Sequence, residues 1–300
     1  MAGGTNLDEA DLGVATDRFR EHGYVVLPAF LSADDLRPAQ DELGILFPTG
    51  EEYHGGVDPE RNARFADGAF SGIDPFPYES VEWSLLGLST KIVHLAETLL
   101  GTTDIRLYEA HNWAKYGGAT EYDQPLHRDF GNHTMVVPST DPRFGEVEMF
   151  IYIHDVPIDA GPTYVVSQTR TRDIPTARLR FLREDEPALY EHETAADGPA
   201  GTVLAYRADT LHRGSAMTNP TGARFVLKAS FRTVSDIWVD KLALTTSLGP
   251  KWHAFVNRAT PRQLELAGFP PRGHAYWTTD TWSATCERYP KADLSAFAPS

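Results

Sequence analysis

The sequence predicts a mainly β fold with flanking helices (α+β), built as an antiparallel barrel or jelly roll inside a helical jacket. Three observations support this. The first hundred residues place apolar side chains at helical spacing. Between residues 105 and 232 the chain changes to short β-rich runs separated by Gly, Pro and Asp turns, and helical spacing returns afterwards. Because the strands do not alternate with helices of adequate length, this pattern does not predict a parallel α/β fold.

The N-terminal part is expected to start with a helix over residues 8–23, where apolar positions recur at helical spacing and a glycine ends the pattern. A short apolar run, YVVLPAF, follows. Ser32 stands just before two aspartates, which favour the positive end of a helix dipole. We therefore expect Ser32 to cap a helix over residues 34–47.

The next stretch, residues 48–78, is rich in Gly, Pro, aromatic and charged residues and is expected to be an extended loop with about one helical turn. Residues 89–101 form another amphipathic helix that ends at Gly101. Residues 1–101 are thus predicted to be a helical support with a loop.

Five runs in the middle of the chain have strand composition. They are IRLYEAHNWAKY, EVEMFIYIHDV, PTYVVSQ, GTVLAYRAD and RFVLKASFR. The last alternates with period two, so its residues divide between two faces of a sheet. One face carries Phe225, Leu227, Ala229 and Phe231, and the other carries Arg224, Val226, Lys228 and Ser230.

The chain shows no internal repeat or long linker, so we expect one domain over residues 1–300. Its β core is expected over residues 105–232. That core contains a charged insert of helix or loop at 170–200, and residues 233–300 form C-terminal helices and an aromatic tail.

Composition limits the classes of function. The chain is 41% hydrophobic, which is enough to bury a sizeable core. Its formal charge of −15 works against binding to nucleic acid or to anionic lipid, since both are polyanions. Cys286 is the only cysteine, so neither an intrachain disulfide nor a thiolate-rich metal site is possible.

The beginning of the chain is acidic and lacks the apolar region of a signal peptide. No apolar run approaches the roughly 20 residues that span a bilayer. We therefore expect a cytoplasmic protein that handles a small molecule and contacts neither membrane nor nucleic acid; no oligomeric state is predicted.

The segment QPLHRDFGNH holds the central motif, His127 and Asp129 two residues apart. At a strand end, residues with this spacing point to one side and can reach one ion together. His212 follows a β-rich run and is the best candidate for a third ligand. Two His and one carboxylate on one side of a metal are typical of non-haem Fe(II) oxygenases, although these residue types do not exclude zinc.

Arg224 lies twelve residues after His212 and begins the alternating strand, and its parity makes it a candidate to point into the barrel. A buried guanidinium is costly without an anion, and a planar carboxylate would satisfy it with two parallel hydrogen bonds. A keto acid that chelates the metal at one end and pairs with Arg224 at the other fits this pattern. Arg232 is the alternative, less suited because it ends the strand.

Five motifs in this order carry a resemblance to a known family. They are REHGYVVLPAFLSADDL, PLHRDF, DAGPTYVVSQTRTRD, LHRGSAMTNPTGAR and RYPKADLSAF. The chain resembles the phytanoyl-CoA dioxygenase-like branch of the Fe(II)- and 2-oxoglutarate-dependent oxygenases over most of its length. The motifs together are specific for the family and unspecific for the substrate.

The resemblance implies a double-stranded β-helix of the jelly-roll or cupin-like type. It implies Fe(II) bound by His127, Asp129 and His212, with 2-oxoglutarate paired to Arg224 and O2 as the second co-substrate. Thr163 is expected to face the barrel near the co-substrate. Relatives place the arginine eleven residues after the distal histidine, with a small hydroxyl residue two after it.

Here the gap is twelve residues, with Gly214 in the second place after the distal histidine and Ser215 in the third. An insertion of one residue reconciles both and makes Ser215 a co-substrate contact. Gln168 also departs from the family, which commonly has a histidine there.

The expected reaction is hydroxylation of an unactivated C–H bond of a small molecule, with release of succinate and CO2. Related halogenases replace the carboxylate ligand by a small residue, so the presence of Asp129 favours hydroxylation. Desaturation, cyclisation or epimerisation stay open. The alternatives are a zinc- or manganese-dependent cupin-like hydrolase or isomerase, and a catalytically silent binding module. The other histidines of the β region, His111, His133 and His154, are expected to be structural.

Overall fold

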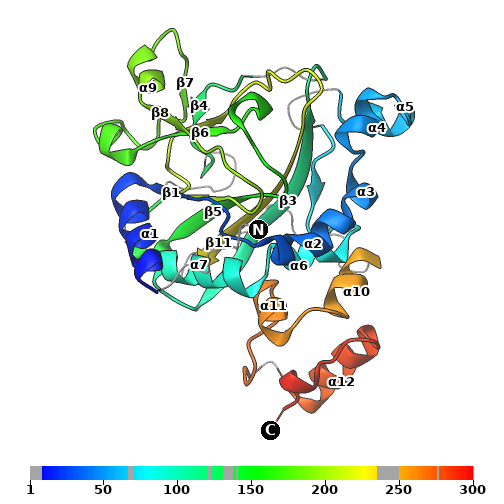
Figure 1. Cartoon of the computed structure of the whole chain (residues 1–300). Helices are drawn as coiled ribbons and strands as arrows, with labels where there is room; N and C mark the ends of the chain where they lie inside the picture. Colours follow the sequence, from blue (N-terminus) through cyan, green and yellow to red (C-terminus); the bar gives the residue numbers. More distant parts are fainter. Residues whose placement is uncertain are drawn as a thin grey trace.

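The fold is built on two antiparallel sheets that face each other, in a computed structural model of the chain (Figure 1). It describes residues 9–66, 71–119, 123–130, 138–139, 141–234, 250–275 and 277–299. The large sheet has the strand order β1-β9-β5-β11-β3-β2, and the small sheet has the order β7-β4-β10-β6-β8. Such a pair of sheets is the jelly-roll form of the double-stranded β-helix, and it confirms the predicted fold class.

The strands of the large sheet are β1 (Tyr24–Leu27), β2 (Asp74–Pro75), β3 (Ile105–Tyr116), β5 (Glu146–Tyr152), β9 (Val203–Tyr206) and β11 (Ala223–Thr233). Those of the small sheet are β4 (Leu126–His127), β6 (Thr163–Val166), β7 (Arg180–Phe181), β8 (Glu193–Ala195) and β10 (His212–Gly214). The two long strands β3 and β11 pair with each other over their whole length, and this pairing is the longest in the large sheet.

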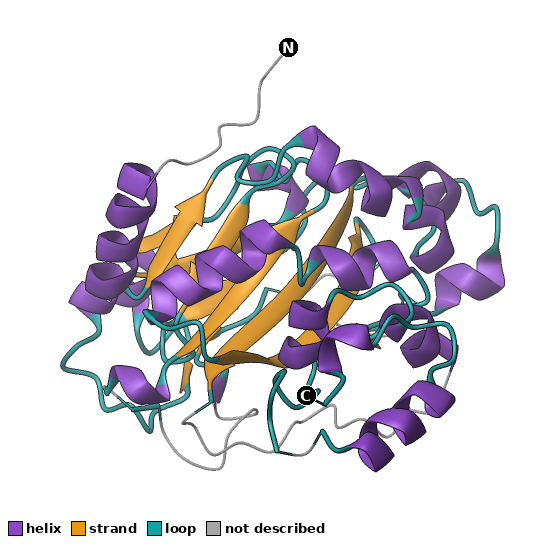
Figure 2. Cartoon of the chain, turned by 90° about the horizontal axis from the view of Figure 1, so that it is seen from below, coloured by secondary structure: helices purple, strands orange, loops and turns teal. Residues whose placement is uncertain are grey.

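Helices cover the outer face of the large sheet, as Figure 2 shows from below. The helices before β3 are α1 (Glu9–His22), α2 (Ala33–Asp41), α3 (Leu43–Leu46), α4 (Gly50–His54), α5 (Pro59–Ala63), α6 (Val81–Leu86) and α7 (Thr90–Leu100). The later helices are α9 (Pro187–Glu191), α10 (Pro250–Val256), α11 (Pro261–Leu266) and α12 (Thr279–Arg288). Short 3-10 turns are η1 (Pro142–Phe144), η2 (Ile158–Ala160), η3 (Gln168–Arg170) and η4 (Ser295–Phe297).

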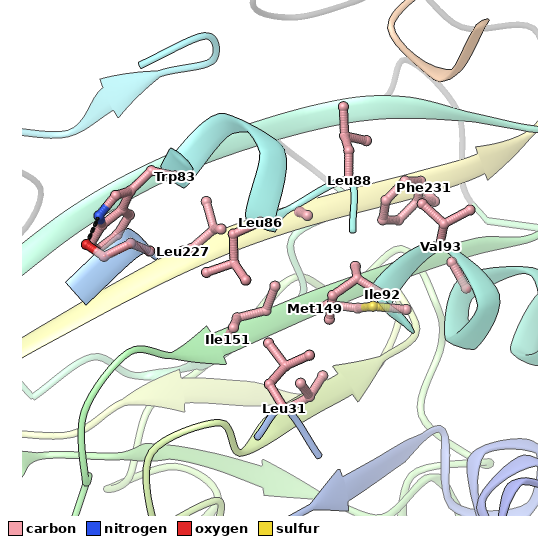
Figure 3. Packing of buried hydrophobic residues seen from close by; sticks show 14 of the residues in the cluster. Leu31, Trp83, Leu86, Leu88, Ile92, Val93, Met149, Ile151, Leu227 and Phe231 are labelled. Atoms are coloured by element: carbon pink, nitrogen blue, oxygen red, sulfur yellow. Dashed lines mark hydrogen bonds between the residues drawn. The ribbon is translucent and has the colours of Figure 1, made fainter. Parts of the chain in front are cut away.

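The main core lies between these helices and the large sheet. Figure 3 shows Leu227 and Phe231 of β11 and Ile151 of β5 packed against α6 and α7. The indole Nε1 of Trp83 donates to the carbonyl of Ala39 at 2.7 Å, so even this buried polar atom has a partner. The apolar half of the alternation predicted in β11 is therefore the helix-facing half.

The opposite face of β11 points between the two sheets. Val226 lies there in a second apolar cluster, with Tyr152 of β5, Tyr206 of β9 and Val165 of β6. Arg224 and Lys228 share this face by parity and are buried. The interior between the sheets is thus part apolar and part charged, and it is the place where a polar site can form.

The structure confirms most predicted N-terminal elements and corrects two. The helix predicted over 8–23 is α1, and Gly23 follows it with a φ of +78°. Ser32 caps α2 through a capping box with Asp35, as expected, but the helix predicted over 34–47 is broken into α2 and α3. The loop predicted over 48–78 contains two short helices, α4 and α5, because Thr49 and Asp58 each cap a new helical turn.

The insert at 170–200 was expected to be helix or loop. It contains the helix α9, and it also supplies both edge strands of the small sheet, β7 and β8. Buried Arg128 holds the insert to the barrel. Its guanidinium donates to the carbonyls of Pro175, Thr176 and Arg178, and also to Asp209 in the β9–β10 turn. Four backbone acceptors satisfy one buried cation and fix the insert beside β4.

Among the described residues, no helix has the length and apolar character that crossing a bilayer requires.

Candidate metal centre

The predicted ligands His127 and His212 lie on neighbouring strands of the small sheet. The two residues are direct partners in the register of β4 and β10, and their ring centroids are 4.5 Å apart. Asp129 follows β4 by two residues and turns to the same side. One ligand atom from each of the three side chains lies within 4.8 Å of the others. Residues far apart in the chain thus converge at one point.

The protonation of both imidazoles suits a metal. Nδ1 of His127 is 2.9 Å from the carbonyl of Pro125, and Nδ1 of His212 is 3.1 Å from the carbonyl of Thr210. A carbonyl only accepts hydrogen bonds, so each Nδ1 is protonated, and Nε2 is the nitrogen left to bind a metal when the imidazole is neutral. Both Nε2 atoms then point at the same carboxylate, Asp129.

Asp129 lies between the two imidazoles. Its Oδ1 is 3.5 Å from Nε2 of His127, and its Oδ2 is 3.4 Å from Nε2 of His212. Burial alone would raise the pKa of Asp129, but the ammonium of Lys228 and the two histidines hold it well below its usual range. The carboxylate is therefore ionised, as a metal ligand must be.

The neighbours of His212 favour a proton on this imidazole. Burial lowers the pKa of this imidazole, and the charge and hydrogen bond of Asp129 more than reverse that effect and raise it. A site that attracts one positive charge to a buried carboxylate is also suited to a cation. The donor set of two imidazole nitrogens and one carboxylate oxygen on one side matches the ligands that non-haem Fe(II) uses with open positions opposite.

The structural role expected for the other histidines of the β region stays a prediction, and the structure describes the surroundings of two of them. Nδ1 of His111 is 3.4 Å from Oε1 of Glu109. The ring of His154 packs against Phe225 with centroids 5.5 Å apart. His133 lies outside the described residues. Within the described part of the chain, the only group of three or more possible ligand side chains is the predicted one.

Arg224 is buried with only 3% of its surface exposed. It donates to the carbonyl of Gly161 through one terminal nitrogen, while its Nε has no hydrogen-bond partner among the described residues. No carboxylate of the described chain lies within ion-pair distance of it, whereas buried Lys228 and Arg232 each have a carboxylate partner and buried Arg128 has four carbonyls. A buried guanidinium in this state can accept an anion.

Lys115 is the direct cross-strand partner of Arg224 and is also buried. Its ammonium donates to the carbonyl of Ser215 at 2.5 Å. Burial and the neighbouring charge of Arg224 lower the pKa of Lys115 to about 7, and Asp123 opposes this shift only in part. Two cations side by side inside a protein indicate a place for a negative charge.

Arg232, the alternative to Arg224, is committed elsewhere. Its guanidinium donates to Oε2 of Glu146 at 2.8 and 2.6 Å. The same group stacks over the ring of Tyr108 at 3.7 Å. The ion pair and the stacking together satisfy Arg232, so Arg224 is the better anchor for an anion.

Thr163 and Ser215 lie near the cationic pair. The hydroxyl of Ser215 donates to the carbonyl of Pro162 at 2.7 Å, and its backbone carbonyl holds Lys115. Burial raises the pKa of Tyr152, and both Arg224 and Thr163 lie close enough to that hydroxyl to oppose the rise. Their predicted contact with a co-substrate stays a prediction, and their position beside Arg224 is consistent with it.

Sequence reasoning missed four residues of this interior: Lys115, Glu148, Tyr206 and Lys228. Tyr206 donates to Oδ2 of Asp129 at 3.0 Å, and Lys228 lies 3.3 Å from the same oxygen. A signal for two of them was present. Lys228 shares the face of Arg224 in the alternation of β11, and Lys115 lies on the inward parity of β3.

The sequence model of the family described as phytanoyl-CoA dioxygenase (PhyH) matches residues 19–225. A search of curated proteins gave no match.

Solved structures share the fold at low identity. The epimerase SnoN from nogalamycin biosynthesis, in complex with Fe3+, alpha ketoglutarate and nogalamycin RO, superposes with a TM-score of 0.55 and 18% identity, over 75% of this chain and 85% of its own. EctD from S. alaskensis, with 2-oxoglutarate and 5-hydroxyectoine, gives 0.53 and 17%, over 80% of each chain. AviO1 from Streptomyces viridochromogenes Tue57 gives 0.57 and 13%, over 77% of this chain and 99% of its own. These similarities confirm the double-stranded β-helix.

Proposed function

The chain belongs to the phytanoyl-CoA dioxygenase (PhyH) family, and we propose that it is a non-haem Fe(II)- and 2-oxoglutarate-dependent dioxygenase. In this proposal it hydroxylates an unactivated C–H bond of a small molecule. His127, Asp129 and His212 hold the Fe(II), and Arg224 binds the far carboxylate of 2-oxoglutarate.

The observation that carries the proposal is the spacing of the two sites along β11. Lys228 contacts Asp129, and Arg224 lies four residues before it on the same face of the strand. Four residues of a strand span about 13 Å. The arginine side chain and 2-oxoglutarate, a five-carbon diacid, together fill a distance of this size. The keto end of 2-oxoglutarate would then reach the metal while its far carboxylate pairs with Arg224.

The side chains between the two sites are largely apolar. Val226 lies between Arg224 and Lys228 on the inner face, with Trp113 and Tyr152 as its cross-strand partners. All three belong to the buried cluster between the sheets. Such walls exclude water and strengthen the electrostatic contacts of a bound dianion.

When bound, Fe(II) supplies the activation of O2 that couples decarboxylation of 2-oxoglutarate to oxidation of a substrate. The protein's part is to hold the metal ligands in place and to orient the co-substrate. The backbone carbonyls of Pro125 and Thr210 fix both imidazoles with Nε2 forward, and Arg224 fixes the co-substrate by its distal end. Rigid placement of this kind determines which C–H bond is nearest to the oxidant.

Hydroxylation is our proposal for the outcome because the carboxylate ligand is present. Asp129 occupies the third protein position, which an enzyme that binds halide at the metal would leave to a small residue. The similar fold of SnoN, described as an epimerase, and that of EctD, solved with 5-hydroxyectoine, show that this fold serves several outcomes. The substrate's position at the metal decides among them.

The test is formation of succinate from 2-oxoglutarate by the purified protein with Fe(II), ascorbate and O2, alone and with a library of small molecules. We expect slow uncoupled succinate formation that a true substrate accelerates. Asp129→Ala should abolish the Fe(II)-dependent succinate, while Asp34→Ala, which changes an exposed aspartate on α2, should not change it.

Succinate at the wild-type rate from Asp129→Ala would contradict the assignment of Asp129 as a metal ligand. Hydrolysis of library members by the Zn(II)-loaded protein, without any succinate from the Fe(II) form, would support the hydrolase instead.

A further inference from the structure

Behind Asp129 lies a buried charged cluster that holding a metal does not require. It comprises Lys228 of β11, Glu148 of β5, Tyr206 of β9 and Glu109 of β3, all on the inner face of the large sheet. Lys228 contacts Oε2 of Glu148 closely and lies 3.7 Å from Oε2 of Glu109. The hydroxyl of Tyr206 is 3.2 Å from Glu148. The cluster therefore joins the large sheet to the ligand carboxylate of the small sheet.

Lys228 is buried among carboxylates. Its ammonium contacts Glu148 and lies 3.3 Å from Asp129 and 3.7 Å from Glu109. A buried ammonium is stable only when its donors meet acceptors with good geometry. Here it has carboxylate oxygens on three strands or turns, so its position is fixed from several sides.

The two oxygens of Asp129 have different surroundings. Oδ2 accepts from the hydroxyl of Tyr206 at 3.0 Å and lies 3.3 Å from the ammonium of Lys228. Oδ2 also lies 3.4 Å from Nε2 of His212, whereas the contact printed for Oδ1 is with Nε2 of His127 at 3.5 Å. Oδ2 is thus engaged by two donors of the large sheet, and Oδ1 is the less engaged oxygen of the carboxylate.

We propose that Lys228, anchored on Glu148 and aided by Tyr206, is a positioning residue that holds Oδ2 of Asp129 so that the carboxylate binds the metal through Oδ1 alone. This inference rests on the metal-binding part of the proposed function and not on the identity of co-substrate or substrate. Partners of this kind around a metal ligand change metal affinity by about 10- to 100-fold.

Charge and position can be separated because the cluster offers a matched pair of changes. With the histidines neutral, Asp129, Glu148, Glu109 and Lys228 sum to −2 (three carboxylates and one ammonium). Lys228→Met alone makes the sum −3 and would by charge attract a cation more strongly. The double change Lys228→Met with Glu148→Gln restores −2 and removes the donor that holds Oδ2.

The experiment is a titration of the metal-free full chain with Co(II), followed by the visible absorption of the bound ion. For the double variant we expect Co(II) affinity about 10- to 100-fold weaker than wild type. The visible spectrum should also change, because Oδ2 of Asp129 loses the ammonium and keeps only the Tyr206 hydroxyl of the two large-sheet donors. Lys91→Met, which removes a partly exposed lysine paired with Asp35 on another part of the molecule, is the control and should leave both unchanged.

Tyr206→Phe provides a second test that removes one hydroxyl and leaves the packing intact. It should weaken Co(II) binding by several-fold, with a smaller spectral change, since Lys228 still holds the same oxygen. Wild-type Co(II) affinity and a wild-type spectrum in the double variant would overturn the inference. If the double variant does not fold, wild-type Co(II) affinity and spectrum in Tyr206→Phe would overturn it. If the unaltered protein fails to bind Co(II) or Fe(II), the proposed function itself falls.

Discussion

The two faces of the large sheet both bury side chains, but the buried side chains are apolar on one face and partly charged on the other. On the outer face, Leu227 and Phe231 of β11 are fully covered by helices and need no partner except other apolar groups. On the inner face, Arg224 and Lys228 of the same strand are also buried, and each depends on specific acceptors. One strand of eleven residues therefore contributes to stability on one side and to the proposed chemistry on the other.

The difference shows how burial acts on the two kinds of group. Apolar burial is non-directional, so a change on the outer face should cost free energy of unfolding in proportion to the volume lost. A buried charge depends on the direction of its hydrogen bonds. A substitution on the inner face should therefore change ligand binding at the site that the charged side chain contacts. Substitutions on opposite faces of β11 can thus be compared directly.

The largest expected effect on stability is that of Leu227→Ala on the outer face. This side chain is completely buried, and removing it from a packed core typically costs about 2–5 kcal/mol. We expect the free energy of unfolding to fall by about 3 kcal/mol in urea titrations, while the Co(II) affinity of the folded protein stays the same. Val14→Ala, at a 57% exposed position, is the control and should change stability little. A loss of metal affinity in Leu227→Ala would mean that the two faces are not independent.

On the inner face, Arg224→Met should act mainly on the co-substrate. Loss of a charge-assisted contact costs about 1.5–3 kcal/mol, so we expect 2-oxoglutarate to bind about 100-fold more weakly. Calorimetric titration of the anaerobic Fe(II) protein with 2-oxoglutarate measures this change. Metal affinity should not change, and Arg37→Met, which removes an exposed guanidinium paired with Asp34, should bind 2-oxoglutarate normally. Unaltered 2-oxoglutarate affinity in Arg224→Met would place the anion elsewhere.

A smaller effect is expected from pH through Lys115. Because burial and Arg224 lower its pKa to about 7, Lys115 loses its charge as the pH rises through that value. The charged form favours a dianion nearby, so 2-oxoglutarate affinity should decline above pH 7, by roughly tenfold near pH 8. Lys115→Met should bind weakly at pH 6.5 and show little dependence on pH. The same calorimetric titration across this range gives the answer, and a wild-type affinity that is flat with pH would show that Lys115 does not contact the co-substrate.

The sequence allowed β11 and the helices α1 and α7 to be predicted because those elements are long and periodic. The alternation of β11, the cap at Ser32 and the glycine after α7 each have a local physical cause. The short strands β4 and β10 could not be predicted as strands, since two or three residues are too few to show a period. His212 was accordingly expected after a strand and in fact begins one.

Sequence reasoning named the candidate ligands and the candidate anion anchor, and it missed the residues that contact them. His127, Asp129, His212 and Arg224 were recognised by residue type, order and family resemblance. Tyr206 and Glu148 gave no such signal, because their role depends on which strands are neighbours in the sheet. Only the observed register, with Glu148 opposite Tyr206, brings both to Asp129.

The most direct test of the central claim is anaerobic titration of the Fe(II)-loaded protein with 2-oxoglutarate in a visible spectrometer. Chelation of the iron by the keto acid produces a weak charge-transfer band, and we predict that this band appears and saturates in the unaltered protein. It should be absent in Asp129→Ala. An iron-loaded protein that shows no band at saturating 2-oxoglutarate would contradict the account.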